Sequence, residues 1–530
     1  MDDEKLPHRA FFSDNKSTDI VSKIVFNIFL FVSIVVCISW LNSLRMRSRS
    51  LRSVKSIDFS DFSTLFLPAS MCKFGSLSTQ VPNYKTVSSR LGSRVVVVIS
   101  KWAQIEESRD DLKLRRYFSE CTSSLSLGWK GLVFSDPFTM EFSRLNDFFE
   151  FASQAFPAGL FTGASNRGVG TFLDCAPEEI ILTPDTLKLL VLQILFEAIV
   201  HPSWDKRTHC DVIGKLSELS DDLFQLHTSG HLPKDFYVSG SALTRTVDRL
   251  IEPFVLLELD RGTSTRPETL LSYLLWTKRT LSLSQSIDDQ NCEDVEGFLT
   301  IKHINHLSFE SFFLGHHSLI PCLRTLLAAL TARPGWGRRL HSELSEHQRS
   351  CPHRCRKHAT NLTVECFDLE TKCLSFAKAL CLEALRFTVV GWPLGCLREA
   401  FRDGKEFLAG DLVLLNEPAV FHDPAIWFKE CQMPATSEPL QHVFAPMDRH
   451  GKPNANYLAS RVLLSSKVCF LPRAFLFRLL LATAAHLFTQ CSFRQAEEGP
   501  KEFWDSPLVL PLDSSLMRCA TLYQNDLRRT

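Results

Sequence analysis

The sequence has no excess of charge of either sign, because 59 lysine and arginine residues stand against 59 aspartate and glutamate residues. A protein that coats DNA or RNA needs a basic surface, so this balance argues against a nucleic acid partner. The chain also lacks the composition of a disordered protein, which has few hydrophobic residues. Here 45% of the residues are hydrophobic and 22% are charged, which excludes a disordered chain. The 530 residues contain no internal repeat and suffice for one large domain or two to three ordinary ones.

Several common catalytic signatures are absent. The chain has no Gly-x-Ser-x-Gly elbow and no Gly-x-Gly-x-x-Gly turn. Gly163 and Gly168 have the spacing of a phosphate-binding loop, but Val169 stands where that loop requires lysine. These absences exclude serine hydrolases of the elbow type and the common nucleotide-binding classes.

The 17 cysteines lack the even number and the regular spacing of a disulfide framework, which predicts reduced thiols in a cytosolic compartment. One stretch gathers metal-capable residues, namely Cys351, His353, Cys355 and His358, followed by Cys366 and Cys373. Its spacing matches no standard zinc knuckle, and the stretch is strongly basic. We therefore interpret it as an exposed connecting loop, with a zinc site as the less favoured alternative.

Charged residues are missing from residues 24–44, a run of mainly Ile, Val, Phe and Leu that is long enough to cross a hydrocarbon core of about 30 Å. No small-residue cleavage site follows, which favours a retained anchor over a removed signal peptide. The basic flank on the C-terminal side is predicted to lie in the cytoplasm. That flank contains Arg45, Arg47, Arg49, Arg52 and Lys55, against Lys5, Arg9, Lys16 and Lys23 on the other side.

These features predict four parts of the chain. An N-terminal tail covers residues 1–23, a single transmembrane anchor residues 24–44, a basic and serine-rich linker residues 45–66, and the main domain residues 67–530.

The main domain is predicted to be mainly α with a small β region. The β-branched run Val95–Ile99 and the run Leu412–Leu415, which follows a Gly-Asp turn, predict strands. Apolar residues at a spacing near 3.6 predict helices over residues 183–200, 268–281, 306–332, 370–387 and 472–488.

The helix over residues 306–332 is apolar over most of its circumference, which predicts that it lies in the middle of the core. Its internal Pro321 predicts a kink. It carries two consecutive histidines, His316 and His317. Because adjacent helical residues point about 100° apart, we do not expect both of them to ligate one ion.

Cys469 lies just before the helix that starts at Pro472. Unpaired amides and the helix dipole at that point would stabilise a thiolate, which is a soft-metal ligand and a known axial ligand of haem iron. The alternative is a buried cysteine that has no role beyond packing.

Together, several segments resemble the C-terminal half of a cytochrome P-450, a haem-thiolate monooxygenase. In order, they are Glu383-Ala-Leu-Arg386, Gly410-Asp-Leu-Val-Leu-Leu-Asn416, Phe421-His-Asp-Pro-Ala-Ile-Trp427, and Cys469 ahead of Arg473-Ala-Phe475. The N-terminal anchor is similar to that of the microsomal members. The resemblance implies a cytochrome P-450-like fold preceded by one transmembrane helix, a single-pass location in the endoplasmic reticulum membrane, and a cytosolic main domain.

The resemblance also implies roles for particular residues. Cys469 would be the axial ligand of the haem iron, and Arg473 would contribute to haem binding. Glu383 and Arg386 would form a structural ion pair beneath the haem-binding loop. His317 and Ser318 occupy the positions of the family's acid and threonine in the distal helix, and would relay protons as catalytic residues.

The haem-binding loop departs from the family pattern. The family's loop has two glycines around the cysteine, whereas residues 462–472 read Val-Leu-Leu-Ser-Ser-Lys-Val-Cys-Phe-Leu-Pro and contain neither. Leu471 stands where glycine lets the backbone approach the porphyrin, so the loop resembles a degenerate form.

The resemblance leaves three hypotheses for function. The first is a monooxygenase that receives electrons from NADPH through a reductase partner and oxidises a lipophilic small molecule such as a terpenoid, sterol or polyketide, for example in secondary metabolism. The second is a haem-dependent isomerase that needs neither oxygen activation nor a reductase. The third is a non-catalytic relative that keeps the fold and the anchor but has lost haem.

Overall fold

The computed structural model describes the helical core and short strands of the chain. The described residues are 25–40, 86–91, 94–99, 114–116, 128–133, 135, 139–154, 156–174, 179–181, 184–202, 206–229, 240–261, 267–285, 299–350, 362, 364–388, 394–397, 401–402, 406–407, 412–415, 446–447, 450–454, 473–495 and 520–524.

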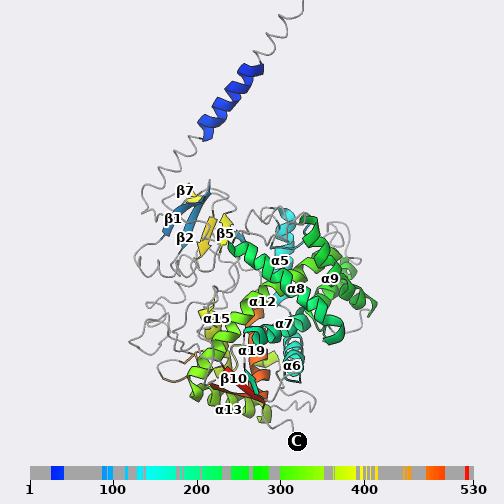
Figure 1. The fold of residues 1–530 in the computed structure, drawn as a ribbon, viewed down its shortest axis with the longest axis vertical. Helices are drawn as coiled ribbons and strands as arrows, with labels where there is room; N and C mark the ends of the chain where they lie inside the picture. Colours follow the sequence, from blue (N-terminus) through cyan, green and yellow to red (C-terminus); the bar gives the residue numbers. More distant parts are fainter. Residues whose placement is uncertain are drawn as a thin grey trace, which may run out of the picture.

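Helices make up most of the described residues (Figure 1). In chain order the labelled helices are α5 (Met140–Gln154), α6 (Ala158–Asp174), α7 (Pro184–Ile199), α8 (Lys206–Ser229), α9 (Gly240–Asp260), α10 (Leu270–Gln285), α12 (Ile301–Ala332), α13 (Pro334–Ser350), α14 (Val364–Phe367), α15 (Ser375–Phe387) and α19 (Arg473–Gln490). The helices predicted over residues 183–200, 268–281 and 472–488 are confirmed as α7, α10 and α19.

Helix α12 runs through the middle of the molecule and packs against α7, α8, α9, α10, α13, α15 and α19 (Figure 1). It begins with a reciprocal cap: the Thr300 hydroxyl accepts a hydrogen bond from the His303 amide, and the His303 ring accepts one from the Thr300 amide. It continues through Pro321 and ends at Ala332, ahead of Arg333 and Pro334. The prediction of a central apolar helix is confirmed, although the helix begins five residues earlier than predicted.

Helix α15 begins at Ser375, later than the predicted start at residue 370. The backbone of Leu374 has φ +52°, so the chain turns sharply at that residue and cannot extend the helix backwards. The first turn is capped from another helix, since the Glu343 carboxylate of α13 accepts hydrogen bonds from the amides of Phe376 and Ala377, each at 2.9 Å.

Short strands form three sheets. The largest has the order β1 (Thr86–Leu91), β2 (Arg94–Ile99), β8 (Leu412–Leu415), β5 (Leu394–Leu397), β3 (Leu114–Arg116). Both predicted strands are confirmed, as β2 and β8, and they pair in parallel with Val97 opposite Val413. This pairing brings two segments more than 300 residues apart in sequence next to each other. The other sheets are β4 (Glu179–Ile181), β10 (Ala520–Gln524), β9 (Cys491–Gln495) and the pair β6 (Phe401–Arg402), β7 (Glu406–Phe407).

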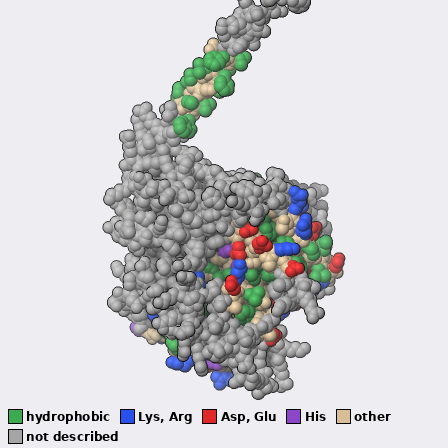
Figure 2. Space-filling model, viewed as in Figure 1, with side chains coloured by type: hydrophobic (Ala, Val, Ile, Leu, Met, Phe, Trp, Pro, Cys, Tyr) green, Lys and Arg blue, Asp and Glu red, His purple; other side chains and the backbone are tan. Residues whose placement is uncertain are grey.

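Two described helices are relevant to membrane insertion. Val25–Trp40 is a short apolar helix within the predicted anchor, and its side chains are exposed, with Phe29 72% and Phe26 65% accessible. Figure 2 shows its surface as mainly hydrophobic. Ile301–Thr331 is long and apolar enough to span a membrane by composition, but 89% of its apolar window is buried inside the molecule. We therefore treat this second helix as the core helix of the main domain.

Candidate functional site

The two consecutive histidines of α12 converge on one hydroxyl group. His316 Nδ1 lies 3.0 Å from Ser220 Oγ, and His317 Nε2 lies 3.1 Å from the same oxygen. Ser220 is buried on α8, and the two imidazole rings are tilted against each other with their centroids 4.5 Å apart. The sequence analysis does not expect both rings to ligate one ion. They nevertheless share one hydrogen-bond partner, because the side chains bring both rings toward α8.

The acceptor groups around the two rings determine which atom donates each hydrogen bond. His317 Nε2 also lies 3.1 Å from the Ser220 carbonyl oxygen, which can only accept, so Nε2 carries a hydrogen. That hydrogen is shared with Ser220 Oγ, whose own hydrogen then points to His316 Nδ1. The result is an ordered chain from His317 through Ser220 to His316.

Both histidines are neutral near pH 7. Burial, with a smaller contribution from the positive charge of Lys188, lowers the pKa of His316 to about 3. Burial and the neighbouring His316 ring lower the pKa of His317 well below its ordinary value. The pair is therefore a hydrogen-bond relay between uncharged rings and holds no permanent positive charge.

The relay ends at a partly exposed ion pair. Asp221 Oδ1 lies 3.9 Å from His316 Nδ1, and Asp221 Oδ2 lies 2.5 Å from Lys188 Nζ. The side chains of Lys188 and Asp221 are 34% and 44% exposed, so this end of the relay reaches solvent. Asp221, His316 and His317 place their ligand atoms within 4.8 Å of one another, but the Ser220 hydroxyl lies between the two rings. We interpret the group as a hydrogen-bond network.

Ser318 follows directly on α12 and is buried. One helical turn further along the same face, Cys322 Sγ lies 2.9 Å from Thr388 Oγ1. Burial raises the pKa of the Cys322 thiol to about 12, and the positive charge of Arg473 opposes that rise. Arg473 is the first residue of α19, a helix that packs against α12.

Arg473 is buried at the start of α19, four residues after Cys469. Cys469 itself lies outside the described residues, as do the segment 421–427 and residue Leu471. In the sequence Cys469 directly precedes α19, where a helix N-terminus would stabilise a thiolate, and α19 packs against α12, the helix that carries Ser318.

Glu383 and Arg386 form a bidentate ion pair on α15. The two oxygen–nitrogen distances are 2.7 Å to Nε and 2.6 Å to Nη2, and both side chains are fully buried. Charge-assisted bonds of this geometry are among the stronger ones in proteins. The pair lies on α15, which packs against both α12 and α19.

The analysis of the sequence missed another buried carboxylate, Glu310 of α12. Glu310 accepts three hydrogen bonds of 2.7 Å, from Trp129 Nε1 and from the amides of Leu132 and Val133. A Cβ atom on Gly131 would collide with the Glu310 carboxylate, so only glycine allows this close approach. Glu310 therefore fixes the segment 128–133 onto the central helix.

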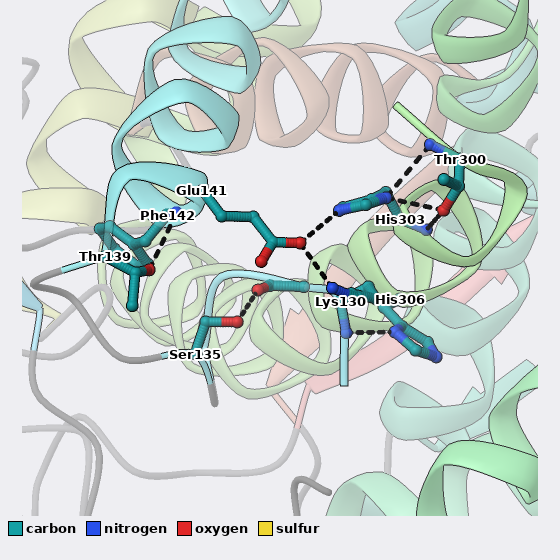
Figure 3. Close-up of polar contacts among 9 residues, drawn as sticks. Lys130, Ser135, Thr139, Glu141, Phe142, Thr300, His303 and His306 are labelled. Atoms are coloured by element: carbon teal, nitrogen blue, oxygen red, sulfur yellow. Dashed lines mark hydrogen bonds and ion pairs between the residues drawn. The ribbon is translucent and has the colours of Figure 1, made fainter. Parts of the chain in front are cut away.

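The same segment is also held through Lys130 by the polar cluster of Figure 3. Glu141 of α5 lies between Lys130 Nζ at 2.7 Å and His303 Nε2 at 3.2 Å, and the Lys130 amide donates to His306 Nδ1 at 2.7 Å. Trp129 stacks on His306 with ring centroids 4.1 Å apart. The sequence did contain a signal for the contacts of Glu310. It is a glutamate within an apolar helical stretch, and a buried carboxylate requires donors from elsewhere in the chain.

Comparisons with known proteins identify the fold. No family model and no curated protein matches the sequence. Solved structures that match include a zebrafish cytochrome P-450 with abiraterone (TM-score 0.61, 17% identity) and one with progesterone (TM-score 0.60, 17% identity). Each match covers 86% of this chain and 99% of the zebrafish chain. The haem domain of cytochrome P-450DA matches with TM-score 0.59 and 15% identity, over 86% of this chain and 94% of that one.

Proposed function

We propose that this chain, which has the cytochrome P-450 fold, is a membrane-anchored haem-thiolate monooxygenase that oxidises a lipophilic small molecule. The observation that carries the proposal is the match of 86% of the chain to cytochrome P-450 structures, combined with a fully buried Glu383–Arg386 pair on the helix between α12 and α19. The zebrafish structures contain abiraterone and progesterone, which supports a lipophilic substrate.

In this proposal Cys469 supplies the thiolate ligand, and Arg473 supports the haem from the first turn of α19. When bound, a thiolate-ligated haem supplies oxygen activation with electrons from NADPH delivered by a reductase. Ser318 holds a proton at its Oγ on the distal helix. Protons would reach the distal helix from the side of Asp221 through His316, Ser220 and His317. This route requires the hydrogen bonds of the relay to reverse and a water molecule to bridge the 3.9 Å between Asp221 and His316.

The anchor is the N-terminal apolar helix. Its exposed Phe, Val and Ile side chains favour a hydrocarbon environment over water. With the basic residues 45–55 on the cytoplasmic side, the main domain faces the cytosol at the endoplasmic reticulum membrane, where a reductase partner can reach it.

One observation favours the isomerase as a second candidate. The relay consists of neutral imidazoles and a hydroxyl, and its carboxylate, Asp221, lies 3.9 Å from His316 Nδ1 and is already paired with Lys188. A neutral relay transfers a proton less readily than a carboxylic acid does. An enzyme that rearranges a substrate peroxide needs no net proton delivery and no reductase.

The test is the absorption spectrum of the reduced, carbon-monoxide-bound protein, measured on the full chain and on Cys469→Ala. We expect a Soret band shifted far to the red in the wild type and lost in the variant. Absence of haem from the wild type would exclude both enzymes and leave the non-catalytic relative. If haem binds, turnover of a lipid hydroperoxide without NADPH or reductase would identify the isomerase instead of the monooxygenase.

A further inference from the structure

We infer that His347, Cys366 and Cys373 form a zinc-binding site at the junction of α13, α14 and α15. The site lies apart from the residues assigned to haem and oxygen chemistry, and the inference does not depend on the proposed function. His347 is on α13, Cys366 is on α14, and Cys373 is in the turn that leads into α15.

The spacing of the three donors supports a tetrahedral ion. His347 Nε2 lies 3.4 Å from Cys366 Sγ, His347 Nδ1 lies 3.5 Å from Cys373 Sγ, and the two sulfur atoms are 3.5 Å apart. Around a tetrahedral zinc with Zn–S of about 2.3 Å and Zn–N of about 2.0 Å, donor pairs are separated by roughly 3.5 to 3.8 Å. The two contacts of the ring involve different nitrogens, and only one nitrogen can ligate a given ion. One ligand atom from each residue lies within 4.8 Å of the others, so a small rotation of the ring and the thiols would bring the three donors around one zinc.

The backbone around the site is held in a strained conformation. Leu374, directly after Cys373, is buried with φ +52° and ψ +38°, a region that a bulky side chain rarely adopts. Such a conformation persists only where the surroundings impose it, and it is common at ligand sites. Here it directs the chain back from α15 so that Cys373 meets Cys366.

A buried ammonium group fixes the turn between the two cysteines. Lys378 of α15 has no exposed surface, and its Nζ donates to the Asp368 carbonyl and to Thr371, with Thr371 Oγ1 at 3.0 Å. Contact with Cys366 and burial raise the pKa of the Cys373 thiol, and the positive charge of Lys378 opposes that rise. A bound dication would displace the thiol proton. The Glu343 carboxylate lies on α13, one helical turn before His347, and its negative charge offsets the positive charge of Lys378.

The chemistry of the donors selects the metal. Two thiolates and one imidazole are soft to borderline ligands, which suit zinc and exclude calcium and magnesium. Binding releases the two thiol protons to solvent, so the dication and two thiolates form a neutral unit within the partly buried cluster. A zinc ion with three protein ligands takes a water molecule in the fourth position.

The alternative that the same geometry allows is a disulfide between Cys366 and Cys373, which would require an oxidant and the loss of two electrons and two protons. The sequence predicts a reducing cytosolic location for the main domain, and the two sulfur atoms lie 3.5 Å apart, whereas a disulfide bond is about 2.05 Å long. Zinc is therefore the favoured occupant.

The experiment is elemental analysis of zinc and iron in the purified full-length chain, with zinc K-edge X-ray absorption on the same sample. We expect about one zinc per chain with two sulfur neighbours, independent of the haem iron content. His347→Gln and Cys373→Ala should lose the zinc. His341→Gln, an exposed histidine of the same helix, and Cys381→Ala, a buried cysteine of α15, should retain it.

The inference would be overturned by a wild-type chain that binds no zinc after incubation with the metal, or by bound zinc without sulfur neighbours. A metal-free chain in which mass spectrometry finds a Cys366–Cys373 disulfide would also overturn it. The absorption measurement requires no variant, so a substitution that prevents folding leaves the test intact.

Discussion

Glu383 and Arg386 have the same spacing and nearly the same contact distance as a second pair, Glu258 and Arg261. The first pair is fully buried with a 2.6 Å contact, whereas the second has a 2.7 Å contact and a 40% exposed arginine. Burial removes water as a competing partner, so the loss of one member leaves a charge that nothing else can solvate.

We therefore predict that Arg386→Met lowers the free energy of unfolding by about 3–5 kcal/mol. Glu258→Gln should lower it by less than about 1 kcal/mol, because the charge that remains is on the 40% exposed Arg261, where solvent screens it. Urea unfolding followed by circular dichroism measures both. Equal effects of the two substitutions would contradict the role assigned to burial.

His316 predicts how stability depends on pH. Its pKa in the folded chain is about 3 because the ring is buried, against an ordinary value of 6.5. As the pH falls, the His316 ring therefore binds a proton near pH 6.5 in the unfolded chain but only near pH 3 in the folded chain. The stabilisation from the neutral ring is fully present above about pH 6.5 and is lost as the pH falls toward 3.

Between pH 7.5 and pH 5 this single group should lower the free energy of unfolding by about 2 kcal/mol. His316→Gln should reduce the loss by about that amount. Thermal unfolding at a series of pH values provides the measurement. A variant with the same pH slope as the wild type would refute the assignment.

At the level of elements, the contact between α6 and α7 depends on a close approach of two backbones. A Cβ atom on Gly168 of α6 would lie 3.0 Å from Ile194 Cα and 3.1 Å from Ile194 N of α7. Gly170, two residues on in the same helix, has nothing within 4 Å of such an atom. The two glycines thus differ in packing but share the same helix.

Gly168→Ala should destabilise the protein by about 1–3 kcal/mol, because the backbone of α7 cannot move aside as a flexible side chain can. Gly170→Ala should be neutral or stabilising by up to about 1 kcal/mol, since alanine lowers the entropy of the unfolded chain and favours helix. Differential scanning calorimetry of the two variants measures both changes in stability. A larger loss for the Gly170 variant would show that α6 and α7 do not pack at Gly168.

For the whole molecule, membrane association should depend on the N-terminal apolar helix. Deleting residues 1–44 should move the protein from the carbonate-resistant membrane fraction to the soluble fraction. The double substitution Val35→Arg and Val36→Arg should have the same effect, because each arginine at the helix centre costs about 2.5–3.5 kcal/mol on insertion. Fractionation of cells that express each form makes the comparison.

Persistence of both altered forms in the carbonate-resistant fraction would mean that another segment inserts into the membrane. The buried α12 does not provide such a segment in the folded chain, since its apolar surface is already covered by α7, α9, α15 and α19.

The sequence alone determined the features that depend on local pattern. Apolar periodicity identified α7, α10, α12 and α19, and β-branched runs identified β2 and β8, because the face that a residue presents follows from its position in a helix or strand. The spacing of three between Glu383 and Arg386 was sufficient to predict that they meet, since such residues are neighbours on a helix. The mainly helical character also followed from these patterns, whereas the cytochrome P-450-like fold was implied by the resemblance of several segments to that family.

Only the tertiary structure decided the contacts between distant segments. Ser220 joins the two histidines across almost 100 residues, Glu310 holds a loop about 180 residues away, and His347 meets two cysteines from other elements. No local pattern specifies such partners, because they depend on which helices pack together and on side-chain rotamers. The late start of α15 has the same origin, since the cap at Glu343 and the turn at Leu374 come from packing against α13.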